Sequence, residues 1–325
     1  MSYGGDVNRG PFLDVINWLF CSIALAFVAL RLISRNLREE QGRWGFDETC
    51  LLFAMAVILA RSIYITYCIR LGFGRHLHPL LEADVRETVR LTRHLVILEA
   101  LSLWTWALPK LPVAILLYRI FGKFRRGLGA ILYSLVALLI AIVVVQTVVT
   151  FVKCHPISKN WNPTVPGRCW NPDIYTDIGY FAGAYSAALD FGLAFFASTQ
   201  VFSLQMSKSR KMLIAASLSL GIPAGVTTCI KLAMIASLNT SDITYSTVPL
   251  EVWNSVEGCA LIVAASVPAT RPVMRLLGKR LGEWRSLLSG RRSHGSAKAE
   301  GTDHSSGISS KDRVAQPIEL ERGRH

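Results

Sequence analysis

The chain has 325 residues, of which 51% are hydrophobic and 18% are charged, and its mean hydropathy is +0.37. This composition is too apolar for an ordinary soluble globular protein. The formal net charge of +13 is therefore attributed to basic cytoplasmic segments of a membrane protein, and nucleic-acid binding is not expected. A basic strip from Arg271 to Arg292 is placed to contact anionic lipid.

Apolar stretches long enough to cross a bilayer follow one another along the chain, since a spanning helix needs about 20 apolar residues. They are Phe12–Ile33, Asp47–Ile69, His94–Tyr118, Leu128–Phe151, Ile174–Leu204, Met212–Leu238 and Leu250–Met274. The sequence thus predicts an all-α protein, a bundle of seven transmembrane helices. The first stretch is expected to remain in the protein, because its apolar core is too long for a signal peptide and no small-residue cleavage site follows it.

The distribution of Lys and Arg predicts the orientation, because cytoplasmic segments retain basic residues. With the N-terminus outside, the inner segments hold 22 of the 35 basic residues and the outer segments hold nine. We therefore expect a short extracellular N-terminus over residues 1–11 and a membrane domain over residues 12–276. Residues 277–325 are rich in Ser, Gly, Lys and Arg and are predicted to form a disordered cytoplasmic tail.

The loop between the fourth and fifth stretches reads CHPISKNWNPTVPGRCWNPD. In the predicted orientation Cys154 and Cys169 face an oxidising compartment, which favours a disulfide between them. Cys68, near the outer end of the second stretch, is an alternative partner. Asn239 begins the acceptor sequence Asn-Thr-Ser in another outer loop and is a glycosylation candidate. No Cys or His spacing indicates a metal site, and no cofactor is expected.

Ionisable side chains inside a membrane are costly, usually face the bundle interior and usually pair. The candidates for such an intramembrane network are Arg61, Glu99, Lys110, Asp190, Lys231 and Glu257. At 1.5 Å per helical residue, Lys231 and Glu257 both lie about 12 Å beneath the outer surface. Because they occupy adjacent stretches at equal depth, we predict that they form an ion pair.

Lys110 lies between Pro109 and Pro112, which remove helix hydrogen bonds and are expected to bend the third stretch. Lys110 lies about 14 Å from the inner surface and Asp190 about 20 Å, a gap that a lysine side chain can cross. We expect Lys110 to contact Asp190, directly or through water, with Arg61 as a rival partner. Two interpretations stay open: the pairs fix helix packing, or they act in binding or switching.

Short motifs extend from about Arg31 to Leu277. They are Trp44-Gly-Phe-Asp47, Gly72-Phe-Gly-Arg-His76, Lys110, Leu117-Tyr-Arg-Ile-Phe121, Cys154-His-Pro156, Trp161, Cys169, Asp190, Asp242-Ile-Thr244, Trp253, Glu257 and Pro268-Ala-Thr-Arg-Pro272. In order and spacing the chain resembles the fungal rhodopsin-domain family of seven-helix membrane proteins, which includes candidate receptors of plant-pathogenic fungi.

The chain departs from that family at several positions. Glu48, Pro112 and Lys231 stand where the family tends to carry aspartate, serine and arginine, and the family's proline near Ala197 or Ser198 is missing. The polar network is therefore expected to differ in detail. A retinal Schiff base needs a lysine in the seventh helix, and Leu250–Met274 contains none, so light sensing of the opsin type is rejected.

The favoured interpretation of function is a receptor-like sensor in the plasma membrane. A small or lipophilic ligand would enter from the outer face, near the Cys154–Cys169 loop and the pair of Lys231 with Glu257. The inner loops and tail would contact a cytoplasmic signalling protein. The lipid bilayer is the other expected partner.

Two alternatives stay open beside the receptor-like interpretation, and the family's occurrence beside secondary-metabolite genes favours an accessory role in such a pathway. One is a membrane-embedded enzyme of the terpenoid-cyclase type, residing in the endoplasmic reticulum, with Asp190 and Glu257 as acids. It is less favoured because a cation is predicted beside each carboxylate and no aspartate-rich diphosphate-binding motif is visible. The other is a transporter or accessory protein of such a pathway, although no inverted repeat is visible.

Overall fold

The computed structural model describes residues 8–36, 45–121, 127–162, 164–203, 221–235 and 242–270. Most of these residues are helical, which confirms the predicted all-α class. The predicted tail over residues 277–325 and the glycosylation candidate Asn239 lie outside the described residues.

The described part of the membrane domain consists mainly of long helices. Their bounds are α1 Gly10–Asn36, α2 Phe46–Arg70, α4 Val85–Ala107, α5 Lys110–Phe121, α6 Leu128–Val152, α7 Pro172–Ser203, α9 Gly221–Ile235 and α11 Val248–Ser266. The short elements are α3 Leu77–Ala83, α10 Ile243–Ser246, the 3-10 helices η1 Ile157–Asn160 and η3 Val267–Thr270, and the strands β1 Cys154–His155 and β2 Arg168–Cys169.

The described residues contain five helical stretches that are long and apolar enough to cross a bilayer, so the protein is a multi-pass membrane protein. They are Gly10–Asn36, Phe46–Arg70, Val85–Arg119, Gly129–Val152 and Ile243–Ser266, at the places of the predicted first to fourth and seventh stretches. The described parts of the predicted fifth and sixth stretches are α7, with 32 residues, and α9, with 15. The count of seven spans and the orientation stay predictions.

The third stretch begins nine residues before its predicted start at His94, because α4 begins at Val85. Asp84 ends the preceding segment in an extended conformation, and its carboxylate accepts hydrogen bonds from the backbone N–H groups of Arg86 and Glu87. This N-cap starts the helix earlier than apolar composition suggests. Arg86, Arg90 and Arg93, which were counted with the outer segments, therefore lie on the first turns of α4.

The third stretch is interrupted at the predicted place. Helix α4 ends at Ala107 and α5 begins at Lys110, and Pro109 and Pro112 have no N–H to donate to the preceding turn. The seventh stretch was predicted to continue to Met274, but α11 ends at Ser266 and continues as the 3-10 helix η3 to Thr270. Pro268 within η3 accounts for this change in helix type.

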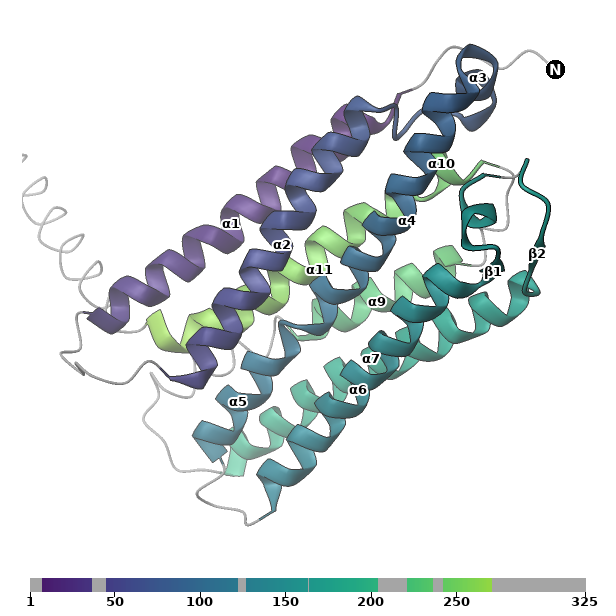
Figure 1. Ribbon diagram of the computed structural model, residues 1–325. Helices are drawn as coiled ribbons and strands as arrows, with labels where there is room; N and C mark the ends of the chain where they lie inside the picture. The colour runs from purple at the N-terminus through teal and green to yellow at the C-terminus, as the bar shows by residue number, and fades with distance from the viewer. Residues whose placement is uncertain are drawn as a thin grey trace, which may run out of the picture. The chain divides into compact units, whose positions relative to one another are not determined.

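Helix α11 packs against α1, α2, α4, α5 and α9, and α7 packs against α6 and α9. Figure 1 shows α1 and α2 on one side of α11 and α4, and α6 and α7 on the other. Large apolar side chains on α6, including Ile131, Leu138 and Val145, are more than half exposed. In a membrane such an outward face is solvated by lipid chains rather than by water.

At one end of the helices, β1 and β2 form an antiparallel pair in which Cys154 lies opposite Cys169. The predicted disulfide between them is present, whereas Cys68 is a buried free cysteine. A Cβ at Gly167 would lie 2.4 Å from the carbonyl oxygen of His155, so this close pairing of the two chain segments requires glycine.

The same end carries α3 and α10 (Figure 1). The Asp242 carboxylate accepts from Leu77 N–H at 2.9 Å and contacts His76 Nδ1 at 2.5 Å, while the ring of His76 stacks on Tyr245. Burial raises the pKa of Asp242, but the hydrogen bonds from His76, Leu77 and Thr244 outweigh burial and leave this pKa below its ordinary value. These contacts fix the segment after α2 against the segment before α11.

Candidate functional site

The first turn of α5 places the Lys110 side chain against α7 and α11, and this lysine is fully buried. Its ammonium donates to Asp190 Oδ1 of α7 and lies 3.4 Å from the carbonyl oxygen of Ser186. Glu257 Oε1 of α11 is 3.8 Å away. Lys110 therefore contacts two carboxylates, of which the sequence indicated only Asp190.

The structure also brings Lys231 and Glu257 together. The Lys231 ammonium donates to Glu257 Oε2 and, at 3.0 Å, to Asn254 Oδ1, and Thr228 donates to Glu257 Oε1 at 3.1 Å. Glu257 thus lies between two lysines. We call Lys110, Asp190, Lys231 and Glu257 the charge tetrad. Its two positive and two negative formal charges cancel, which reduces the large penalty for burying each charge alone.

Arg61 does not reach Asp190, so its role as rival partner of that residue is corrected. Its guanidinium pairs with Glu251 of α11 and donates to Ser102 at 3.0 Å and Ser255 at 3.1 Å. The physical reason is the position of α2, which packs against α11 and α4, whereas Asp190 lies on α7. The planar guanidinium uses its fork of donors on several oxygens at once.

Glu99 meets a phenol instead of a cation. Its Oε1 accepts a hydrogen bond from the Tyr175 hydroxyl, which lies 3.1 Å from Thr150 Oγ1. No Lys or Arg nitrogen lies within 4 Å of the Glu99 carboxylate among the residues that the structure describes. The Lys153 ammonium lies 4.2 Å from the centroid of the Tyr175 ring. Glu99 is therefore separate from the charge tetrad.

A second ionic cluster, which sequence reasoning missed, joins the end of α1 to the start of α2. Arg31 contacts Asp47 at 2.7 Å and donates to the Ala265 carbonyl at 2.6 Å, and Arg35 pairs with Glu48. The exposed Arg119 of α5 lies 3.5 Å from Asp47. The sequence feature that could have indicated this cluster is the pair of acids, Asp47 and Glu48, at the start of the second apolar stretch. Arginines lie at the end of the first apolar stretch.

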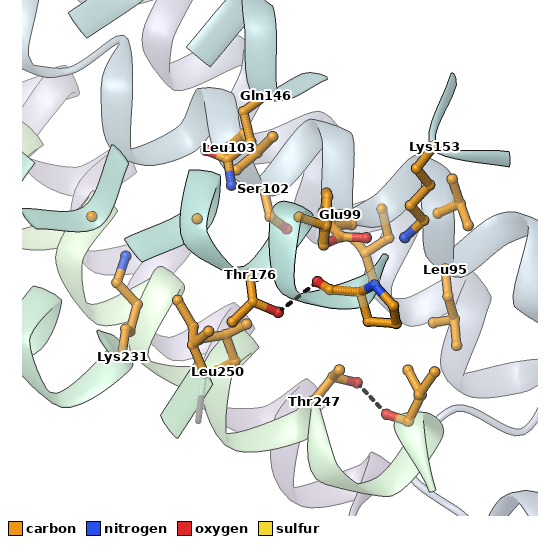
Figure 2. Close-up of a pocket in the computed structure, with 18 of the residues that line it drawn as sticks. Leu95, Glu99, Ser102, Leu103, Gln146, Lys153, Thr176, Lys231, Thr247 and Leu250 are labelled. Carbon is orange, nitrogen blue, oxygen red and sulfur yellow. Dashed lines mark hydrogen bonds between the residues drawn. The ribbon is translucent and has the colours of Figure 1, made fainter. Parts of the chain in front are cut away.

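A cavity of about 820 Å³ lies between α4, α6, α7, α9 and α11, and residues of the Cys154–Cys169 hairpin line its outer part. This volume falls within the range of about 300–1,000 Å³ that is usual for small-molecule sites. Leu95, Leu103, Trp106 and Leu250 supply apolar wall. In Figure 2, Lys153 and Lys231 lie toward opposite sides of the view, with Glu99 nearer to Lys153.

Polar side chains without partners line this cavity. Ser186 Oγ and Gln146 Oε1 are buried and have no hydrogen-bond partner among the described residues. Both residues belong to the cavity wall, as does Lys231 of the charge tetrad. Buried polar atoms in native proteins are usually satisfied, so a site with unpaired polar atoms and an apolar wall is suited to a ligand with both apolar and polar parts.

Similar proteins come from filamentous fungi. The chain is 26% identical over 228 residues to a "SAT4 family membrane protein" of Emericella nidulans, and this match covers 70% of the chain and 56% of that relative. It is 25% identical over 311 residues to "Polyenoic acids biosynthesis gene cluster protein Ba17b" of Metarhizium anisopliae, covering 90% of the chain and 80% of the relative.

A further relative is "Wortmanamides biosynthesis cluster protein C" of Talaromyces wortmannii, 22% identical over 251 residues, covering 75% of the chain and 64% of that protein. The chain thus spans little more than half the length of the Emericella relative. No solved structure matches the chain. The model of the fungal rhodopsin domain matches residues 30–276, which include all the helices from α2 to α11. The chain therefore belongs to the fungal rhodopsin domain family.

Proposed function

We propose that this protein is a receptor-like membrane protein that binds a small lipophilic molecule in the cavity between α4, α6, α7, α9 and α11. The observation that carries the proposal is that the cavity wall includes part of the charge tetrad. Lys231, a member of the tetrad, lines the cavity and pairs with Glu257, and Ser186, whose carbonyl oxygen contacts Lys110, lines it as well. An apolar wall with a few convergent polar groups is the usual composition of a small-molecule site.

The contacts of the charge tetrad connect the cavity to α5, so binding in the cavity can affect the position of that helix. A ligand that contacts Lys231 changes the field at Glu257, and Glu257 lies 3.8 Å from Lys110. Lys110 begins α5 directly after the interruption of the third stretch, and Arg119 of the same helix contacts Asp47. We propose that ligand binding shifts the position of α5 through these contacts, at a plasma-membrane site where the inner loops meet a signalling protein.

Two leucine substitutions on α7 test the cavity. A Cβ at Gly179, which lines the cavity, would meet only Gln146 Nε2 at 3.8 Å, and a Cβ at Gly192 would meet nothing within 4 Å. Gly179→Leu therefore fills the cavity without a backbone clash, and Gly192→Leu is its matched control on the exposed side of α7. Binding of tritiated octanol to protein in nanodiscs is measured after subtracting uptake by empty nanodiscs.

We expect Gly179→Leu to weaken octanol binding by about tenfold or more, because leucine occupies the volume that the probe needs. Gly192→Leu should bind octanol like the unsubstituted protein. Equal binding by all three proteins would show that octanol does not occupy this cavity and would contradict the proposal.

A second candidate function is a membrane component of a secondary-metabolite pathway, either an enzyme or a transport or accessory protein. It is favoured by the printed names of the Metarhizium and Talaromyces relatives, both of which refer to biosynthesis clusters. Asp190→Asn and Glu257→Gln test the enzyme form. Unaltered metabolite profiles with both variants, and with the gene deleted, would exclude the pathway function and leave the receptor-like function.

A further inference from the structure

Glu99 is a carboxylate of the membrane helices that lines the cavity and forms no ion pair within 4 Å among the described residues. The buried acidic residues among those that the structure describes are Asp47, Glu48, Asp190, Glu251 and Glu257. Each has a Lys or Arg nitrogen within 4 Å. Glu99, in the middle of α4, and the exposed Asp173, at the start of α7, line the cavity and have no such cation among the described residues. Carboxylates at this depth normally pair, so the cavity offers an anion that is not paired within the described structure.

The contacts of Glu99 leave part of its carboxylate available. The Tyr175 hydroxyl donates to Oε1, and no hydrogen bond reaches Oε2 from the described residues. In Figure 2 the Glu99 side chain projects among the sticks that line the cavity, between Ser102 and Lys153. A ligand in the cavity can therefore approach Oε2 without displacing the phenol.

Lys153 has a separate structural explanation. It is the C-cap residue of α6, where a positive charge is favoured by the partial negative charge of the helix C-terminus. Its ammonium lies over the Tyr175 ring, and it forms no ion pair with a described carboxylate within 4 Å. Lys153 thus contacts the face of the ring whose hydroxyl donates to Glu99.

A second acceptor lines the same cavity. Gln146 is 8% exposed, lines the cavity, and its side-chain amide makes no hydrogen bond with the described residues. It lies one helical turn before Thr150, which contacts the Tyr175 hydroxyl that binds Glu99. The amide can present its oxygen or its nitrogen to the cavity by rotation about its last side-chain bond.

From these contacts we infer that the cavity binds a lipophilic amine. The protonated amine would donate to Glu99 Oε2 and to the Gln146 oxygen, and the apolar body would lie along Leu103 and Trp106. The ammonium would supply the positive charge that Glu99 lacks, whereas Lys231 at the other side of the cavity already has Glu257 as its counter-ion. The inference rests on the proposed function in taking this cavity as the ligand site.

The test compares three tritiated probes that share an eight-carbon chain: octylamine, octanol and octanoate. An alkylamine is protonated at pH 7, like a lysine side chain. Binding is measured in nanodiscs of zwitterionic lipid, with uptake by empty nanodiscs subtracted. We expect octylamine to bind about tenfold or more tightly than octanol, because a charge pair in a partly desolvated site favours the charged probe.

Glu99→Gln keeps the size and hydrogen-bonding capacity of the side chain but removes its charge. It should abolish the preference for octylamine and leave octanol binding within about twofold, which also shows that the variant is folded. Glu99→Asp, which keeps the charge, should retain part of the preference. Lys153→Gln removes the cation that lies over the Tyr175 ring and should strengthen octylamine binding several-fold, which gives a test that does not depend on altering Glu99.

The inference is overturned if octanoate binds most tightly, since Lys231 would then be the recognised charge. It is also overturned if Glu99→Gln leaves the octylamine preference intact, or if Lys153→Gln leaves octylamine binding unchanged. Failure of the proposed function looks different: no probe would bind the unsubstituted protein above empty nanodiscs, and Gly179→Leu would change nothing.

Discussion

At the scale of single residues, the lysine between the two prolines is explained by its neighbours. Lys110 is fully buried and meets Asp190 and Glu257 at once. An isolated ammonium in a membrane interior would be strongly unfavourable, and two nearby carboxylates would repel each other. The charge tetrad resolves both problems because each lysine lies beside at least one carboxylate and Glu257 is shared.

Reversing the charges at Lys110 and Asp190 tests this explanation. Lys110→Asp alone or Asp190→Lys alone should greatly reduce folded protein, because breaking a buried ion pair costs about 3–5 kcal/mol. The double variant should recover only part of the loss, since the new aspartate at position 110 lies beside Glu257. Adding Glu257→Gln should improve the recovery. Folded protein is measured by size-exclusion chromatography of a fluorescent fusion.

The same variants separate packing from function. If the double or triple variant folds and returns the normal phenotype to a strain from which the gene has been deleted, the pair of Lys110 and Asp190 acts only in packing. If it folds without restoring the phenotype, the orientation of the charges carries function. A double variant that is no better folded than either single variant would contradict the direct pairing of the two residues.

At the scale of elements, the outer part of the cavity depends on the hairpin formed by β1 and β2. The hairpin follows α6 and precedes α7, and residues from both its strands line the cavity. Trp170 N–H donates to the Lys153 carbonyl at 2.8 Å, which joins the start of the hairpin to its end. The disulfide closes the same loop, so it restricts the distance between α6 and α7 where they reach the cavity.

Removing the disulfide should lower stability without changing the membrane helices. The double variant Cys154→Ser with Cys169→Ser opens a loop of sequence separation 15, and loops of that length are stabilised by about 3 kcal/mol. We expect a lower thermal unfolding midpoint, measured by tryptophan fluorescence in nanodiscs. A reductant should lower the midpoint of the unsubstituted protein similarly and leave the double variant unchanged; a shift in both would point to other cysteines.

At the scale of the whole membrane domain, polar contacts outside the charge tetrad also join distant parts of the chain, and two of them lie near the ends of the helices. One is the cluster of Arg31, Asp47 and Arg119, which joins α1, α2 and α5. The other is the contact of His76 with Asp242, which joins the segment after α2 to the segment before α11. Both join helices that are far apart in the sequence, so they limit how the helices can shift when a ligand binds.

The orientation of the domain in the membrane remains a prediction from the distribution of Lys and Arg. With the N-terminus outside, the Cys154–Cys169 hairpin faces the oxidising side and residues 277–325 face the cytoplasm. An epitope at the C-terminus should therefore be protected from protease in intact cells and be digested after permeabilisation. Digestion of the epitope in intact cells would show that the C-terminus is outside, and this result would contradict the receptor-like interpretation.

The sequence alone determined the class of the protein and the approximate positions of its helices. The reason is that the length of an apolar stretch and the positions of its prolines affect helix formation within that same stretch. Lys110, Asp190, Lys231 and Glu257 could be paired by counting helical depth, since each residue adds about 1.5 Å along the axis. The cysteines of the disulfide could be chosen because both lie in one short loop.

Only the tertiary structure decided which side of each helix faces which neighbour. Depth suggested Asp190 as a partner of Arg61, but the packing of α2 against α11 pairs Arg61 with Glu251, which depth did not indicate. Nor did depth show that Glu99 meets Tyr175 instead of a cation. The cavity is likewise a product of packing, because its wall combines five helices whose rotation about their axes depends on side-chain contacts that no single stretch of sequence contains.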